Sequence, residues 1–228
     1  MPTSQNIKVA VDAVVFGYTS KDGLSVLLIR RNIEPYNNSW ALPGGLVGNT
    51  ETLEEAVQRE LKEESGVSIN YLEQLYSFGK PGRDPRNRVI SIAYYGLVKP
   101  EAFELRADTD AADAAWFNIK KMPQLAFDHA EIIQLAHERL KNKILYEPIG
   151  FELLDKKFPF SELEKLYIAV LDRPIDRRNF KKKVSKYGFL DETTEKQQLQ
   201  GAGRPGNLFC FNETKYFSLK KQGINFEI

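Results

Sequence analysis

The sequence Gly45-Leu-Val-Gly-Asn-Thr-Glu51, followed after seven residues by Arg59-Glu-Leu-Lys-Glu-Glu-Ser-Gly-Val67, decides the fold of the first half of this 228-residue chain. Thr52 and Glu55 have the spacing of a capping box, in which each side chain bonds to the backbone of the other residue. Gly66 is a residue type that commonly ends helices. The stretch therefore predicts a helix that begins at Thr52 and ends before Gly66.

The carboxylates of this helix are unusual because two of them point inward. At about 100° per residue, Glu60 and Glu64 fall within about 20° of Leu53, on the apolar face. Glu63 lies about 60° further round the helix. A solvated face with salt bridges is the ordinary explanation of a Glu-rich helix. Inward carboxylates repel one another and lose hydration, so this position favours a bound hard cation such as Mg²⁺ or Mn²⁺.

Two further features surround these carboxylates. Arg59 has Glu55 and Glu63 as its neighbours at i−4 and i+4, so it can hold a carboxylate in one orientation. Gly44 and Gly45 are expected to form a loop whose backbone can approach a diphosphate closely. Both features favour a phosphate-bearing ligand.

The rest of the first half predicts strands and one more helix. Runs rich in Val, Ile, Leu and aromatic residues, separated by turn residues, predict strands over 8–16, 24–30, 71–78, 89–98 and 114–119. A helix is expected from Asp128 to Leu145, with apolar residues at helical spacing. The pattern breaks at residues 147–150, where we place the boundary between a domain of residues 1–147 and one of residues 148–228.

The pattern over residues 45–67 matches every fixed position of the Nudix box, and this match identifies the first domain as a member of the Nudix family. The resemblance implies an α/β/α Nudix sandwich with a mixed sheet over residues 8–146, within an overall α+β fold class. It also implies divalent-metal-assisted attack of water on a diphosphate, in which the metal neutralises charge and provides or positions the nucleophile.

The same resemblance implies roles for the matching residues. Glu60, Glu63 and Glu64 would bind Mg²⁺ or Mn²⁺, and one of them would help to activate water. Arg59 would orient a glutamate, and Gly45 would shape the loop.

The loop after the third predicted strand contains several arginines. Gly82-Arg-Asp-Pro-Arg86 resembles the branch of the family that acts on ADP-ribose. Arginines near a diphosphate can bind it through two parallel hydrogen bonds, so Arg83 and Arg86 are predicted ligand-binding residues. A charged hairpin tip without a ligand is the alternative.

Composition limits the remaining possibilities. One cysteine, Cys210, excludes a disulfide framework and a cysteine-cluster zinc site. With only two histidines, a soft-metal site is disfavoured, whereas carboxylate-bound hard metals are not. No apolar stretch has the length of a signal peptide or a membrane span, so we expect a cytoplasmic protein without a membrane partner.

Charge is distributed unevenly between the two halves. Residues 1–147 carry 17 basic and 20 acidic groups, a net charge of −3, whereas residues 148–228 carry 15 basic and 11 acidic groups, a net charge of +4. From Arg173 to Lys186 there are seven basic groups and one acid, Asp176. Such asymmetry indicates an anionic partner for the second half.

The second half has the pattern of a helix-turn-helix. Ser161 and Glu164 have the spacing of a capping box at the start of an amphipathic helix, and Asp176 can cap a second helix that runs to about Lys186. A polar loop over 191–206 and a strand over 207–211 are expected to follow. The loop tip would form a wing that presents Arg204 to DNA.

The basic residues of the second helix are the predicted DNA contacts. Phe180 and Val184 face the core on this helix, while the predicted contacts lie elsewhere on it: Arg177, Arg178, Lys181 and Lys182. A surface helix that is merely solvated by its charges is the alternative.

The two halves together resemble the Nudix-related transcriptional regulator family. Besides the box, the resemblance rests on the sequences at residues 125–129, 147–151, 173–184 and 203–205. It implies a homodimer whose winged-helix domains bind double-stranded palindromic operator DNA. ADP-ribose, a related nucleotide sugar or a sugar metabolite would set the DNA affinity, and the complete box would allow hydrolysis of the effector as well.

Two other functions use the same features. One is a Mg²⁺-dependent ADP-ribose diphosphatase whose basic domain serves dimerisation or substrate attraction. The other is RNA-end processing by a Nudix domain with a basic surface, although the sequence contains no RNA-binding module that we recognise.

Overall fold

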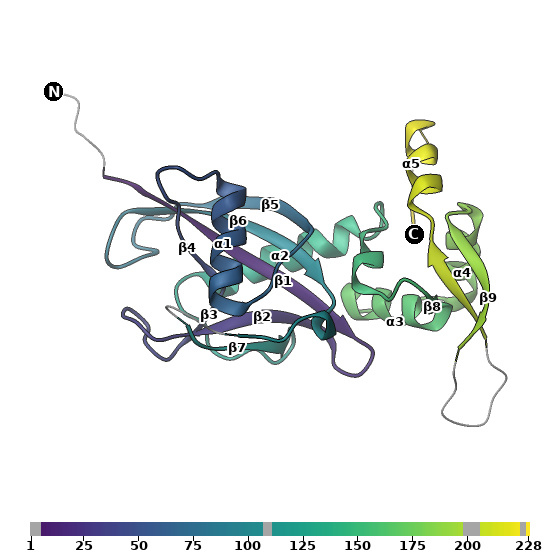
Figure 1. The fold of residues 1–228 in the computed structure, drawn as a ribbon, viewed down its shortest axis with the longest axis horizontal. Helices are drawn as coiled ribbons and strands as arrows, with labels where there is room; N and C mark the ends of the chain where they lie inside the picture. The colour runs from purple at the N-terminus through teal and green to yellow at the C-terminus, as the bar shows by residue number, and fades with distance from the viewer. Residues whose placement is uncertain (1–5, 107–110, 198–205, 224–226) are drawn as a thin grey trace. The chain divides into compact units, whose positions relative to one another are not determined.

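The computed structural model describes residues 6–106, 111–197, 206–223 and 227–228. The chain divides into two compact units, Met1–His137 and Glu138–Ile228 (Figure 1). In the part of the chain that the structure describes, no helix combines the length and the apolar character needed to cross a membrane.

The first unit contains a seven-stranded mixed sheet with the order β3-β2-β1-β6-β5. β1 and β6 pair in parallel, and the other pairs are antiparallel. Two strands lie outside this linear order: β4 pairs with β1, and β7 pairs with β2. The mixed sheet confirms the predicted fold class. The strands are β1 (Lys8–Thr19), β2 (Gly23–Arg31), β3 (Trp40–Ala41), β4 (Gly44–Leu46), β5 (Tyr71–Phe78), β6 (Val89–Val98) and β7 (Ala111–Asn118), with a short 3-10 helix η1 (Pro100–Ala102).

The helix that carries the Nudix box is α1 (Leu53–Ser65). Thr52 is its N-cap and forms the predicted capping box with Glu55. Gly66 ends the helix in the left-handed conformation, with φ of 75°, which glycine adopts without steric cost. Both ends of α1 are therefore where the sequence predicts them.

Two helices cover the two faces of the sheet. Alternate residues of β1 point to opposite faces, and one set packs with α1 in a buried cluster that includes Val11, Ala13, Val15, Ala56, Val57 and Leu61. On the other face Phe16 contacts His137 of α2 (His129–Lys143). Figure 1 shows α1 lying across the near face of the sheet. This is the predicted α/β/α sandwich.

The prediction of a loop at Gly44 and Gly45 is wrong. These residues belong to β4, where Gly44 pairs with Asp12 and Gly45 pairs with Val11. A Cβ on Gly44 would overlap the carbonyl oxygen of Val11, so glycine allows the two backbones to approach closely.

The second unit contains a small sheet and a helical pair. Its strands have the order β8-β10-β9, and all pairs are antiparallel. The core is aromatic, and Phe160, Tyr167 and Phe180 are in ring contact within it. The elements are η2 (Ile149–Leu153), β8 (Phe158–Pro159), α3 (Phe160–Leu171), α4 (Arg177–Lys186), β9 (Leu190–Lys196), β10 (Asn207–Phe211) and α5 (Glu213–Lys221).

Two predictions for this unit are wrong. α3 begins at Phe160 with Pro159 as its N-cap and without a side-chain cap, so Ser161 lies inside the first turn and forms no capping box. The polar loop predicted over 191–206 contains β9, most of whose side chains are exposed. An exposed strand lacks the alternation of apolar residues on which the sequence prediction depends.

Candidate functional site

The three predicted metal ligands, Glu60, Glu63 and Glu64, belong to α1 and line one cavity beside this helix. Glu64 is buried, Glu60 has a side chain that is 15% exposed, and Glu63 is 44% exposed. The Oε2 atom of Glu64 accepts a hydrogen bond of 2.8 Å from the backbone N–H of Gly44. Glu60 lies directly against Gly45, where a Cβ would overlap its carboxylate. The inward direction of Glu60 and Glu64 is as predicted.

Arg59 connects the glutamates of this site. Its Nη1 donates to Glu60 at 2.7 Å and to Glu63 at 3.3 Å. Its Nε and Nη2 form a two-point contact with Glu51, at 2.9 and 2.7 Å. The expected contact with Glu55 is replaced by the contact with Glu51, because Glu55 accepts from the backbone N–H of its capping partner. Sequence reasoning missed Glu51 as a partner, although it is a fixed position of the box.

The electrostatics of the cluster follow from these contacts. Burial raises the pKa of Glu60 above its usual range, and the charges of Glu63 and Glu51 act in the same direction against the opposing effect of Arg59. The hydrogen bond from Arg59 lowers the pKa of Glu51 to about 2. Additional positive charge beside Glu60 would therefore stabilise the charged form of its carboxylate.

The donor set suits a hard divalent cation, because carboxylate oxygens are the ligands that Mg²⁺ and Mn²⁺ prefer. Among the described residues, however, no three acidic, histidine or cysteine side chains are arranged to hold a metal ion. Arg59 is ion-paired with both Glu60 and Glu63, and its guanidinium also pairs with Glu51, so one positive charge faces three carboxylates. The residue types therefore fit the cation, and the arginine compensates only part of the negative charge.

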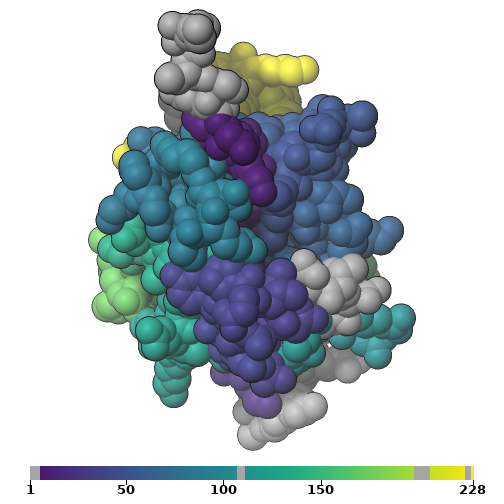
Figure 2. Space-filling view, turned by 90° about the vertical axis from the view of Figure 1, so that its left-hand side faces the viewer, coloured from purple at the N-terminus to yellow at the C-terminus, as the bar shows by residue number. Residues whose placement is uncertain are grey.

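A cavity of about 620 Å³ adjoins the glutamates. Lys8, Arg31 and Arg86 line it together with the acidic residues, so both signs of charge face the same space. In Figure 2 the purple start of β1 lies at the surface, between the blue region that contains α1 and the teal-blue region of the loop after β5. The lining residues are Lys8, Arg31, Ile33, Gly44, Gly45, Leu46, Arg59, Glu60, Glu63, Glu64, Asp84, Arg86, Asn87 and Val89.

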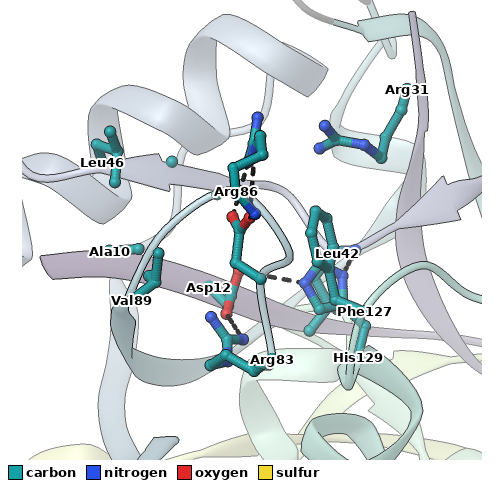
Figure 3. Close-up of a pocket in the computed structure, with 13 residues that line it drawn as sticks. Ala10, Asp12, Arg31, Leu42, Leu46, Arg83, Arg86, Val89, Phe127 and His129 are labelled. Carbon is teal, nitrogen blue, oxygen red and sulfur yellow. Dashed lines mark hydrogen bonds and ion pairs between the residues drawn. The ribbon is translucent and has the colours of Figure 1, made fainter. Parts of the chain in front are cut away.

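The two predicted ligand-binding arginines have different environments. Arg86 is 46% exposed, and it donates to both carboxylate oxygens of Asp84 at 3.1 and 2.8 Å. Arg83 is only 6% exposed, and it is ion-paired with Asp12 and Asp128 beside a smaller cavity of about 80 Å³ (Figure 3). Asp12 and Asp128 were not found by sequence reasoning, because residues this far apart in the chain carry no joint pattern.

The second candidate site is the basic face of α4. Asp176 caps this helix by accepting from the backbone N–H of Asn179 at 2.7 Å, as predicted. Phe180 and Val184 are buried, which also confirms the predicted core face. All four predicted contacts within α4 are exposed: Arg177, Arg178, Lys181 and Lys182.

The turn and the wing complete this site. α3 ends at Asp172 in the left-handed conformation, and a short turn leads to α4. β9 and β10 form a hairpin, which includes a hydrogen bond from the N–H of Gln197 to the carbonyl of Gly206. Arg204, the predicted wing contact, lies outside the described residues. Two packed helices followed by a hairpin are the parts of a winged helix.

Models of two protein families match the chain. The NUDIX domain matches residues 7–136, and the NrtR DNA-binding winged helix domain matches residues 150–211. These two regions contain the carboxylate cluster and the basic helix, respectively.

Individual proteins match over most of the chain. The ADPR responsive transcriptional repressor NtrR of Acinetobacter baylyi is 30% identical over 205 residues, which are 88% of this chain and 80% of that protein. An ADP-ribose pyrophosphatase of Methanocaldococcus jannaschii is 43% identical over 134 residues, which are 59% of this chain and 75% of that enzyme.

A solved structure extends this similarity to three dimensions. Shewanella oneidensis NrtR complexed with a 27mer DNA has a TM-score of 0.75 and 32% identity, and the match covers 91% of this chain and 94% of that chain. The NUDIX domain of the same protein has also been solved with ADP ribose, with a TM-score of 0.54, 35% identity and coverage of 60% and 90%. The chain therefore belongs to the Nudix-related transcriptional regulator family, with a NUDIX domain followed by a DNA-binding winged helix domain of the NrtR type.

Proposed function

We propose that this protein is a transcriptional regulator that binds operator DNA through residues 148–228 and senses ADP-ribose, or a related nucleotide sugar, through residues 1–147. The observation that carries the proposal is the presence in one chain of a charged Nudix cavity and an exposed basic helix in a winged-helix fold. The similarity to an ADPR responsive repressor over most of both chains supports the same function.

The DNA-binding part of the proposal rests on α4. Its exposed cations would neutralise backbone phosphates, which makes binding fall steeply with salt concentration. The predicted contacts are Arg177, Arg178, Lys181 and Lys182 in the helix and Arg204 in the wing. A homodimer would place two such helices on a palindromic operator, with half-sites separated by about one helical turn.

The ligand-binding part rests on the cavity beside α1. Glu60, Glu63 and Glu64 would hold Mg²⁺ or Mn²⁺, and the cation would supply charge neutralisation for a diphosphate. Arg86 would contact the ligand's phosphates, because its exposed side chain lines the same cavity as the carboxylates. Gly45 leaves room for Glu60 at the cavity wall, and Arg59 orients Glu60 and Glu63 by pairing with both of them.

The experiment that tests this function is selection of genomic fragments by the purified protein at low salt, repeated with ADP-ribose and with common pentoses. We expect enrichment of a palindromic sequence and a change in its recovery with ADP-ribose. If no fragment is preferred with or without these compounds, the proposal is wrong.

A second candidate function is Mg²⁺-dependent hydrolysis of ADP-ribose. It is favoured by the three glutamates Glu60, Glu63 and Glu64 on one side of α1 and by the 43% identity to an ADP-ribose pyrophosphatase. In this case the chain's own residues would bind and orient the diphosphate, and one glutamate would take a proton from water.

The two candidates are separated by a pair of assays on the same protein. Turnover of ADP-ribose with Mg²⁺ that is lost in Glu64→Gln, together with no operator binding, would favour the plain hydrolase. Operator binding that ADP-ribose alters would favour the regulator, with or without turnover.

A further inference from the structure

A buried ionic cluster joins three distant parts of the first unit. Asp12 lies on β1, Arg83 lies in the loop between β5 and β6, and Asp128 directly precedes α2. Their side chains are 9%, 6% and 14% exposed, respectively. Figure 3 shows Asp12 and Arg83 facing each other below the level of Arg86.

The guanidinium of Arg83 is committed to carboxylates. It donates from Nε to Oδ2 of Asp128 at 2.9 Å and from Nη2 to Oδ1 at 2.6 Å, a two-point contact. Nη2 also donates to Oδ2 of Asp12 at 3.1 Å. Burial alone would lower the pKa of Arg83, but the two carboxylates outweigh it and raise the pKa above its usual range. Arg83 therefore stays charged and held between two anions.

Asp12 is itself held in place from two sides. Ser91 on β6 donates to its Oδ2 at 2.5 Å, and Nε2 of His129 lies 3.5 Å from its Oδ1. His129 accepts a hydrogen bond from the backbone N–H of Leu42 at Nδ1, so in the neutral ring the proton is on Nε2, facing Asp12. The position of Arg83 is thus fixed by strands and by the start of α2.

Arg86 differs from Arg83 although only two residues separate them. Its side chain is 46% exposed and lines the larger cavity together with Glu60 and Glu64. If Arg83 turned to bind a ligand, Asp12 and Asp128 would stay buried without their shared cation, which is strongly unfavourable. Asp84 is also buried, at 9% exposed, but Arg86 holds it through Nε and Nη2 and is itself 46% exposed, so Arg86 can contact an anion without leaving Asp84 unpaired.

We propose that Arg83 is a positioning residue whose ion pairs with Asp12 and Asp128 anchor the loop of residues 79–88, so that Arg86 faces the anionic ligand. The inference rests on the proposed function, because it requires a phosphate-bearing ligand in the cavity. It assigns different roles to the two arginines that the sequence pattern treats alike.

The test is a double-mutant cycle with Arg83→Gln, Asp128→Asn and the double variant. ADP-ribose affinity is measured by calorimetry on the full chain, and hydrogen–deuterium exchange is followed in peptides that cover residues 79–88. Arg88→Gln, an exposed arginine of the same loop region, is the matched control.

We expect each single variant to weaken ADP-ribose binding about tenfold and the double variant to be no weaker than the worse single variant, because both remove one anchor. Exchange should increase in the peptides of the loop and not across the sheet. The double variant removes the charges of Arg83 and Asp128 together and leaves only Asp12 without its cation, so it keeps the test usable if Arg83→Gln unfolds. Arg88→Gln should leave affinity and exchange unchanged.

Two results would overturn the positioning role. One is a loss of affinity in Arg83→Gln with none in Asp128→Asn, which would make Arg83 a direct ligand contact. The other is unchanged exchange of the loop in both variants. If the wild-type chain binds no ADP-ribose, the ligand assignment fails, whereas the exchange measurement still decides whether Arg83 anchors the loop.

Discussion

Glu60 lies directly against Gly45, so that a Cβ added to this glycine would lie 2.5 Å from the carboxyl carbon of Glu60. The absence of a side chain at Gly45 thus gives the carboxylate of Glu60 the space that it occupies at the cavity. A side chain at position 45 would have to displace either the strand or the glutamate.

Gly45→Ala should weaken Mn²⁺ binding about tenfold or more, because the carboxylate of Glu60 must rotate away from its place against residue 45. Electron paramagnetic resonance of free Mn²⁺ measures this binding. Gly79→Ala is the control, since a Cβ there would lie 3.6 Å from Ile90, an ordinary contact. Mn²⁺ affinity equal to that of the wild type in Gly45→Ala would show that Glu60 does not ligate the metal.

Glu51 should titrate far below an ordinary glutamate. Its hydrogen bonds with Arg59 lower its pKa from 4.5 to about 2. Because the folded-state pKa is the lower one, the pair stabilises the fold above the unfolded-state pKa, and this contribution is lost as pH falls from about 4.5 through 2. Carboxyl-carbon nuclear magnetic resonance should show this low pKa in the wild type and a clearly higher pKa in Arg59→Gln, still held below 4.5 by the hydrogen bond from the backbone N–H of Gly48. A wild-type Glu51 that titrates near 4.5 would mean that the contact does not form in solution.

Single alanine substitutions at Arg177 and Lys181 should abolish or strongly weaken operator binding and leave ADP-ribose affinity unchanged. Each lost phosphate contact should also reduce the slope of log affinity against log salt by about 0.9. Fluorescence anisotropy at several salt concentrations measures both quantities. Lys62→Ala, an exposed change on α1, is the control. Equal losses of DNA and ligand binding would instead indicate misfolding.

Phe180→Ala should unfold the second unit before the first. Phe180 is 3% exposed, and its ring centroid lies 5.7 Å from that of Phe160 and 4.8 Å from that of Tyr167. Its removal leaves a cavity that lowers the free energy of unfolding by about 3–5 kcal/mol. Differential scanning calorimetry should show a lowered transition, with loss of operator binding and retained ADP-ribose binding. Unchanged thermal unfolding would contradict the assignment of Phe180 to the core.

Local signals in the sequence were sufficient for the helices that carry the sites. The capping residues Thr52 and Asp176 and the inward position of Glu60 and Glu64 follow from spacing along one helix, and the structure confirms them. Gly66 likewise marks the end of α1 by its conformational freedom alone.

Contacts between distant segments could not be predicted in this way. The cluster of Asp12, Arg83 and Asp128 depends on how β1, a loop and the start of α2 meet in space. The spacing at Ser161 resembles a capping box, but Pro159 begins α3 earlier, so the local signal is overridden. β9 was missed because its polar side chains contribute little to the core.

We propose that a ligand of the Nudix domain controls DNA affinity. Operator binding measured at fixed salt with increasing ADP-ribose tests this coupling. Fluorescence anisotropy on a selected operator duplex should show that saturating ADP-ribose changes the dissociation constant by about 5- to 150-fold, the usual range of coupling between two sites. A dissociation constant that stays the same at saturating ADP-ribose, in a protein that calorimetry shows to bind it, would contradict the claim.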